Sequence, residues 1–146
     1  MSKYMLIMRG DERALAAYES IDFAEVMAAM GEYNRAMVEA GVLLAGDGLT
    51  DAAQGVVVDF ESTPPVVTDG PYGEIKELFN GFWMIEAATV EEAAEWAKRA
   101  PLGVGNKIEV RRVTDESDFP QTDEVKAQLK EEAEWRTQQE AKAAGN

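Results

Sequence analysis

The sequence predicts an α+β fold, and three observations lead to this prediction. Short apolar runs bounded by glycine, proline and aspartate are typical of strands. Two longer segments carry apolar residues at helical spacing, each behind a capping residue. The segments follow in the order strand, helix, strand, strand, hairpin insert, strand, helix, strand. With the insert set aside, this is the βαββαβ plan of ferredoxin-like domains.

The N-terminal segment predicts a strand and then a helix. Residues 4–8 are apolar and end at a polar break, and a loop with weak helical character follows through Tyr18. Asp22 caps the helix with Glu25 three residues on, and Gly41 ends it. Its apolar residues are Phe23, Val26, Met27, Met30, Tyr33 and Met37. We interpret this methionine-rich face as core packed on a sheet, with a binding groove as the alternative.

The middle of the chain alternates β-prone runs with turn residues. Val56, Val57 and Val58 are strongly β-prone, and the turn around Pro64 lets the next run pair back as a hairpin. Residues 69–73, with two glycines and a proline, form a loop. The predicted elements here are strands at 42–46, 54–61, 66–68 and 81–86, and a short helical stretch at 74–78.

A second helix begins behind Thr89, whose spacing to Glu92 completes a capping box. Pro101 and Gly103 end this helix, and a last strand follows at 107–113. Helices cover only one face of such a sheet, so the other face needs a second layer. We expect that other face to carry Met5, Trp83 and Ile85. Too little chain remains to cover it, so we expect a homodimer with sheet-on-sheet packing.

The composition changes after the last strand. Residues 115–146 hold nine acidic and four basic residues, and a helix is predicted from about Asp123. Its apolar stripe is thin, with Trp135 just beside it. We therefore expect a domain at 1–114, then an acidic linker and helix that docks lightly on its own domain or on the partner subunit. A helix that recognises another protein is the alternative, and residues 141–146 are expected to fray.

The charge of the chain argues against several partners. It has 14 basic and 28 acidic residues, a net charge of −14, which repels nucleic acid and anionic lipid headgroups. The apolar run at 4–8 is shorter than a signal peptide needs and far shorter than the roughly 20 residues of a membrane span. We expect a cytoplasmic protein that contacts neither nucleic acid nor membrane.

The chain contains no cysteine and no histidine. Disulfides, thiolate zinc sites, cysteine nucleophiles and histidine bases are therefore excluded. Any acid–base step must use carboxylates, lysine, tyrosine or bound water. We expect no cofactor and no bound metal, although Asp47, Asp69 and Glu74 are oxygen ligands of the kind that Mg²⁺ or Ca²⁺ takes.

Residues 67–77 carry a recognisable motif, Val-Thr-Asp-Gly-Pro-Tyr-Gly-Glu-Ile-Lys-Glu, which Gly81 and Phe82 follow. It resembles the DGPFAETKE signature of the DGPF branch of the YCII-related family. Tyr72, Gly73 and Ile75 replace the Phe, Ala and Thr of that signature. Two further stretches agree, at 3–7 and 40–49, so the resemblance spans about residues 3–113. The matching signature positions are Asp69, Gly70, Pro71, Glu74, Lys76 and Glu77.

The resemblance implies a ferredoxin-like fold that dimerises as an α+β barrel. It implies no particular reaction, because the DGPF branch has none that is generally established, and wider relatives include cofactor-independent oxygenases, isomerases and ligand-sensing domains. Some YCII-related proteins are thought to use a His–Asp pair. This chain has no histidine, so it does not have that pair.

The signature loop has a structural and a functional interpretation. In the first, its residues shape a turn and the start of a short helix. In the second, the loop lies at the mouth of a pocket. Asp69 or Glu74 is then a base or polar anchor, and Lys76 is the counter-charge for an acidic ligand. Tyr72 and Trp83 are aromatic walls. A small-molecule site, binding or catalytic, is the function we favour.

Two further residues have the same double interpretation. Asp47, between two glycines, either points into that pocket or makes the turn, and Arg9 either binds an anion or pairs with a surface acid. The alternative function is a regulatory or protein-interaction dimer that uses the acidic C-terminal helix, without catalysis. A third idea is an acidic mimic that occupies a basic, nucleic-acid-binding surface.

Overall fold

The computed structural model describes residues 1–70 and 77–145. The chain divides into two compact units, Met1–Val113 and Thr114–Asn146. The described part of the first unit contains a four-stranded sheet, a two-stranded hairpin and three α-helices, and the second unit contains one long helix. This is an α+β chain.

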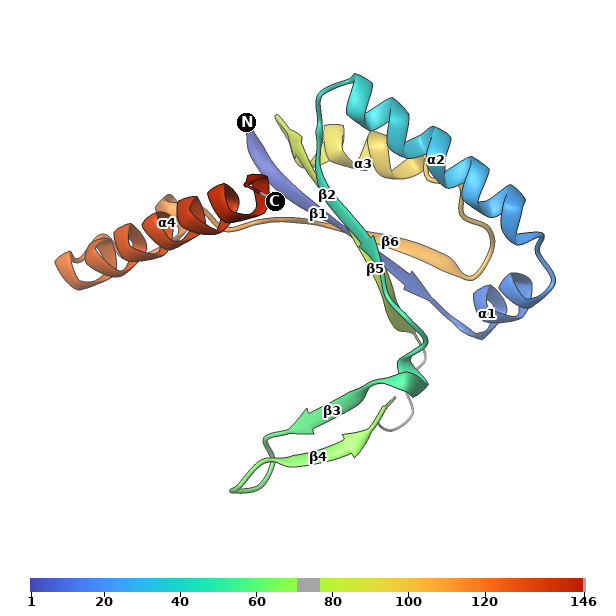
Figure 1. The fold of residues 1–146 in the computed structure, drawn as a ribbon, viewed down its shortest axis with the longest axis horizontal. Helices are drawn as coiled ribbons and strands as arrows, with labels where there is room; N and C mark the ends of the chain where they lie inside the picture. Colours follow the sequence, from blue (N-terminus) through green and yellow to red (C-terminus); the bar gives the residue numbers. More distant parts are fainter. Residues whose placement is uncertain (71–76, 146) are drawn as a thin grey trace. The chain divides into compact units, whose positions relative to one another are not determined.

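The main sheet has the strand order β2 (Leu43–Gly48), β5 (Leu78–Ala87), β1 (Ser2–Gly10), β6 (Asn106–Arg112). Every neighbouring pair in it is antiparallel. The two strands that come first and third in the βαββαβ plan are central, and the other two form the edges (Figure 1). This arrangement is compatible with the predicted ferredoxin-like fold.

Side-chain caps fix where the helices of the first unit begin. In α2 (Phe23–Glu39) the Asp22 carboxylate accepts the backbone N–H of Ala24, and in α3 (Val90–Lys98) the Thr89 hydroxyl accepts that of Glu92. Gly41, after α2, has the left-handed φ of +72° that a non-glycine residue rarely adopts. Both predicted helices are therefore confirmed.

Two predictions give the wrong type of element. The segment before Tyr18 is not a loop but α1 (Glu12–Glu19), because the Asp11 carboxylate accepts the backbone N–H groups of Arg13 and Ala14. Leu78, predicted as the end of a short helix, is the first residue of β5, because its backbone pairs with Gly10 in the sheet. Glu77 is not helical either, and the rest of that predicted helix, at 74–76, lies outside the described residues.

The core lies between the sheet and the two longer helices. Both α2 and α3 lie on the same side of the sheet (Figure 1), and their side chains join one cluster with alternate residues of β1 and β5. Trp83 and Ile85 belong to this cluster, so their predicted position on the other face is wrong. The cluster consists of Tyr4, Leu6, Tyr33, Met37, Val42, Trp83, Ile85, Ala87 and Ala93.

Within this core, Trp83 makes specific contacts with both α2 and β2. Its indole N–H donates to Asn34 Oδ1 at 2.9 Å, and its ring meets that of Tyr33 edge-on with centroids 5.1 Å apart. On β2, a Cβ at Gly46 would lie only 2.9 Å from the indole Cδ1. Glycine is therefore required at position 46 for β2 to pass this close to the indole.

Tyr33 is expected to make folding sensitive to alkaline pH. Its O–H donates to the carbonyl of Trp96 at 2.8 Å, and burial raises the pKa of Tyr33 to about 12. The unfolded side chain ionises near pH 10, so the folded state keeps its proton longer. Stability from this group is fully present below about pH 10 and is lost as the pH rises toward 12. Denaturant unfolding between about pH 9 and about pH 12 measures this loss, which the variant Tyr33→Phe, having no phenol, should not show.

The hairpin insert forms a sheet of its own. β3 (Val56–Asp59) pairs antiparallel with β4 (Val66–Asp69), and a single 3₁₀ turn, Ala52–Gln54, precedes it. The strand predicted at 54–61 is thus shorter at both ends. The hairpin follows β2 through the segment that contains this 3₁₀ turn (Figure 1).

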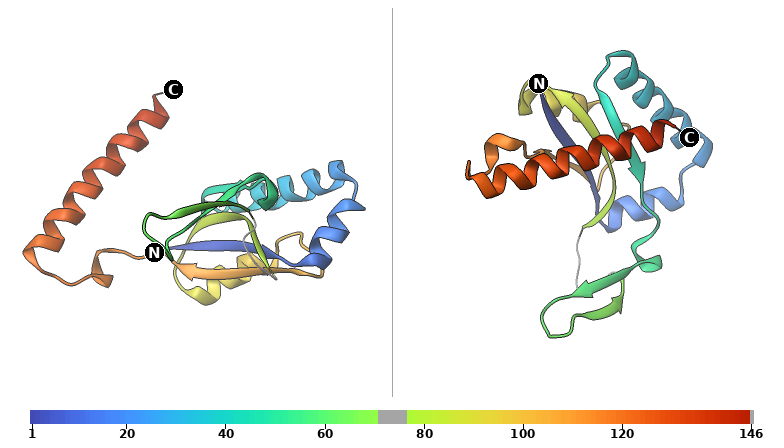
Figure 2. Two further views of the ribbon diagram at one scale, coloured as in Figure 1. Left: turned by 90° about the horizontal axis from the view of Figure 1, so that it is seen from below. Right: turned by 60° about the vertical axis from the view of Figure 1, so that its left-hand side comes forward.

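The second unit consists of a 3₁₀ turn, Glu116–Asp118, and α4 (Asp123–Ala144), shown as one continuous helix in Figure 2. The Thr122 hydroxyl caps it by accepting the backbone N–H of Val125. The helix continues to Ala144. No helix in residues 1–70 or 77–145 is long and apolar enough to cross a membrane.

Candidate functional site

The second face of the main sheet carries an apolar strip, which we define as Met5, Ile7, Phe82 and Met84. These residues alternate with the core residues of β1 and β5, so they point away from α2 and α3. Met5 lies opposite Met84, and Ile7 lies opposite Phe82. All four are only half-buried. The strip is therefore a continuous apolar surface that α2 and α3 do not cover.

Charged residues border the apolar strip. Lys3 lies opposite Glu86 at one end, and on β6 Arg111 and Glu109 lie opposite Met5 and Ile7. Arg111 donates to the Glu109 carboxylate at 2.6 Å. On the β2 side Asp47 lies opposite Phe82. The face thus has an apolar centre and a polar border on both sides.

At the end of the strip, one carboxylate bridges two cations. Arg9 and Lys107 are direct cross-strand partners, a like-charged pair that would be destabilising alone. The Glu77 carboxylate accepts from both, at 2.5 Å from Arg9 and 2.7 Å from Lys107. Lys107 and Arg9 together lower the pKa of Glu77 below the usual glutamate range. The predicted pairing of Arg9 with a nearby acid is found here, and the cluster keeps one net positive charge.

The titration of Glu77 is expected to report on this cluster. Because its pKa is lowered, its contribution to stability is present at neutral pH and lost as the pH falls below about 4, through the folded pKa. Lys107→Met should move the pKa of Glu77 back toward its ordinary value. NMR titration of the side-chain carboxyl measures it. Lys98→Met, which removes an exposed ion pair with Glu95, is the matched control and should leave Glu77 unchanged.

The residues predicted for the site do not all come together. Asp47 lies on the same face as the apolar strip and is exposed, and Arg9 lies at its end in the Glu77 cluster. Trp83 lies in the core on the opposite face of β5. Asp69, the last residue of β4, is exposed at the base of the hairpin. Tyr72, Glu74 and Lys76 lie outside the described residues.

Sequence reasoning missed three residues that define this face: Phe82, Glu77 and Lys107. Side chains around Phe82 alternate between the two faces of β5, but both faces are apolar. The sequence pattern therefore does not show which face the helices cover. Glu77 falls within the helical stretch that the sequence predicts at 74–78. Its contacts with Arg9 and Lys107 join segments far apart in the chain, and no local signal indicates them.

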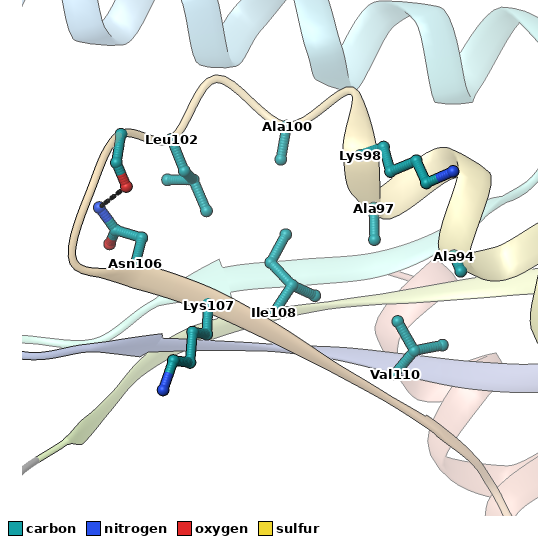
Figure 3. Close-up of a pocket in the computed structure, with 10 residues that line it drawn as sticks. Ala94, Ala97, Lys98, Ala100, Leu102, Asn106, Lys107, Ile108 and Val110 are labelled. Carbon is teal, nitrogen blue, oxygen red and sulfur yellow. Dashed lines mark hydrogen bonds between the residues drawn. The ribbon is translucent and has the colours of Figure 1, made fainter.

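A groove of about 360 Å³ lies between α3 and the edge strand β6 (Figure 3). Its floor is apolar, because Ile108 and Val110 point into it from β6 while Leu102 and Ala97 face them from above. Lys107 points to the other side of the strand (Figure 3). The lining residues are Ala94, Ala97, Lys98, Ala100, Leu102, Gly103, Asn106, Lys107, Ile108 and Val110.

Asp47, Asp69 and Glu74 are the oxygen ligands that the sequence offers to a metal ion. Within residues 1–70 and 77–145, no three Asp or Glu side chains come together as a possible metal site. Glu74 is outside these ranges. We call the face of the main sheet that α2 and α3 do not cover the far face. The groups that it offers to a ligand are apolar side chains, the exposed carboxylate of Asp47 and the Arg9–Glu77–Lys107 cluster.

Two comparisons with known proteins found similar sequences. The YCII-related domain family matches residues 2–117, which include the whole main sheet and the helices that pack on it. An uncharacterised protein of Rhizobium meliloti (strain 1021) is 28% identical over 95 residues, which cover 65% of this chain and 77% of that protein. The family match spans most of the chain, and the protein is a member of the YCII-related family.

Proposed function

We propose that this YCII-related chain is a homodimer that binds a small molecule on the far face of its main sheet. The observation that supports the proposal is the half-buried apolar strip of Met5, Ile7, Phe82 and Met84, which points away from α2 and α3. An apolar sheet face of this kind is stabilised by a second layer. A second copy of the chain supplies that layer as a sheet packed face to face about 10 Å away.

The same face has the composition of a small-molecule site. Such sites are mostly apolar, with a few polar groups that fix the ligand's orientation. Here the apolar strip supplies the walls, Asp47 lies beside Phe82, and the Arg9–Glu77–Lys107 cluster closes one end. A molecule with an apolar body and a polar end fits this arrangement. Phe82 takes the role of aromatic wall that the sequence suggested for Trp83.

We also assign the chain to the DGPF branch of the family on the strength of the motif at 69–77. In this proposal Asp69, Tyr72, Glu74 and Lys76 contribute to the ligand site from the signature loop. Asp69 and Glu74 are the candidate bases, since a chain without histidine and cysteine depends on carboxylates for proton abstraction. Glu77, the last residue of the motif, contacts Arg9 of β1 and Lys107 of β6.

Mass spectrometry of the purified protein tests both parts of the proposal. Under native conditions we expect twice the mass of the 16.0 kDa chain, together with extra mass from a co-purified small molecule that denaturation releases. A dimer that stays empty after exposure to a small-molecule library counts against the ligand site. A monomer at micromolar concentration contradicts the dimer.

The alternative, a protein-interaction dimer without catalysis, depends on the second unit. Trp135 is 57% exposed on α4, and exposed tryptophan is enriched at the centre of protein interfaces. Deleting residues 115–146 tests this alternative. Loss of a captured partner with an unchanged fold supports it. Retention of the partner, or ligand binding that the deletion does not affect, favours the small-molecule site.

A further inference from the structure

The β3–β4 hairpin exposes more apolar surface than a free two-stranded ribbon tolerates. Several of its apolar side chains are between 46% and 77% exposed, and isolated hairpins are marginal in water. The register places Val58 directly opposite Val67, and Val56 lies on the same face opposite Asp69, so this face of the hairpin is apolar apart from one carboxylate at its end. The exposed apolar residues are Val56, Val58, Phe60, Val66 and Val67. Such a surface marks an interaction site.

The hairpin carries negative charge only. Between Arg35 and Lys76 the sequence has no lysine or arginine. The hairpin itself contributes three carboxylates, from Asp59, Glu61 and Asp69. Its outer edges also lack the lysines that commonly protect free strand edges from pairing. A partner for this hairpin must therefore be apolar, offer backbone hydrogen bonds, and be positively charged.

The edge strand β6 meets these three requirements. It is the last strand of the main sheet, so one of its edges has no partner strand in the described chain. The apolar groove of about 360 Å³ lies directly beside it. Residues 98–112 carry five basic residues and one acidic residue in a chain of net charge −14. Lys98, Lys107 and Arg111 each pair with a carboxylate, from Glu95, Glu77 and Glu109, but these basic side chains remain well exposed, so their charge is neutralised only in part.

We propose that the hairpin of one copy adds to the β6 edge of a second copy. Strand addition combines backbone hydrogen bonds with alternate side chains in a pocket. The alternation of apolar and charged side chains along β3 matches that along β6. Val56 and Val58 would enter the groove against Ile108 and Val110, while Asp59, on the other face of β3, would approach the basic residues of β6. The inference rests on the proposed homodimer and names the contact that extends it.

The other strand edges that could pair with the acidic hairpin lack a complementary positive charge. β2, the opposite edge of the sheet, carries Asp47 and no basic residue, so it repels an acidic hairpin. Two hairpins pairing with each other would bring their carboxylates together without a cation. β6 is the edge with the complementary charge. The hairpin contact would also increase the area that the dimer buries. A stable interface buries about 800 Å² on each partner, and the apolar strip alone is small.

Single-cysteine cross-linking tests the contact, because the natural chain contains no cysteine. Val58→Cys is mixed with Val110→Cys or, for a second register, with Ile108→Cys, and the mixture is oxidised. Val58→Cys mixed with Leu44→Cys, on the exposed β2 edge, is the matched control. Disulfides need the two Cβ atoms within about 4.5 Å. Digestion and mass spectrometry identify which positions are joined, and circular dichroism confirms that each variant is folded.

We expect the link from position 58 to position 110 or 108 to form about 100-fold faster than the control link. The reason is that docking raises the effective concentration of the two thiols to about millimolar, compared with about 10 µM protein in solution. A native dimer without this preference overturns the hairpin contact and leaves the dimer intact. A monomer overturns both. Faster linkage to position 44 than to β6 also contradicts the inference.

Discussion

Replacing Trp83 with alanine is expected to lower the free energy of unfolding by about 3–5 kcal/mol. The side chain is 5% exposed, its ring packs edge-on against Tyr33, and its N–H is bonded to Asn34. The substitution removes the ring, leaves a cavity and leaves the Asn34 oxygen without its donor. A domain is typically stable by only about 5–15 kcal/mol, so this loss is a large part of the total. Chemical denaturation followed by circular dichroism measures it.

Trp135→Ala is the matched control for that measurement. Trp135 lies on α4 and is 57% exposed, so its removal should change stability by no more than about 0.5 kcal/mol. Equal effects of the two substitutions would contradict the assignment of Trp83 to the core. A ligand-wall role for Trp83 predicts the reverse pattern, with binding lost and stability kept.

Met84→Asp is expected to dissociate the proposed dimer. Met84 lies in the apolar strip opposite Met5, half-buried and pointing away from the helices. In a face-to-face dimer the new carboxylate would be buried without a partner, which costs about 3–5 kcal/mol. This corresponds to a rise in the dissociation constant of roughly 100- to 4000-fold. Sedimentation equilibrium of wild type and variant over a range of concentrations measures it.

Two controls separate this effect from a loss of folding or a general effect of charge. Met84→Leu keeps the apolar surface and should leave the dimer intact. Leu15→Asp places the same charge on α1, at a side chain that is 53% exposed, and should also leave it intact. An unchanged dissociation constant for Met84→Asp would show that the far face is not the dimer interface.

Much of the chain's local structure is predictable from short stretches of sequence. The cap at Asp22, the cap at Thr89 and the glycine stop at Gly41 are each encoded within a few residues. The strands are recognisable as short runs of apolar, β-prone residues. Local signals can also be missed: Asp11 caps α1 by the same chemistry, yet the weak apolar pattern after it favoured a loop.

The faces of the strands are not predictable in the same way. β5 reads Leu-Phe-Asn-Gly-Phe-Trp-Met-Ile-Glu-Ala, with large apolar residues on both sides. Alternation assigns Trp83 and Ile85 to one face and Phe82 and Met84 to the other. It does not say which face the helices cover, because both are apolar. Only the packing of α2 and α3 makes Trp83 a core residue and Phe82 a surface one.

The sequence by itself determined the order of most elements, the ends of α2 and α3 and the exclusion of histidine and cysteine chemistry, because each depends on neighbouring residues or on composition. The tertiary structure decided the strand order, the covered face, the groove beside β6 and the bridge from Glu77 to Arg9 and Lys107. These features join residues separated by tens of positions. Such contacts form only when the whole sheet assembles, and no local pattern specifies them.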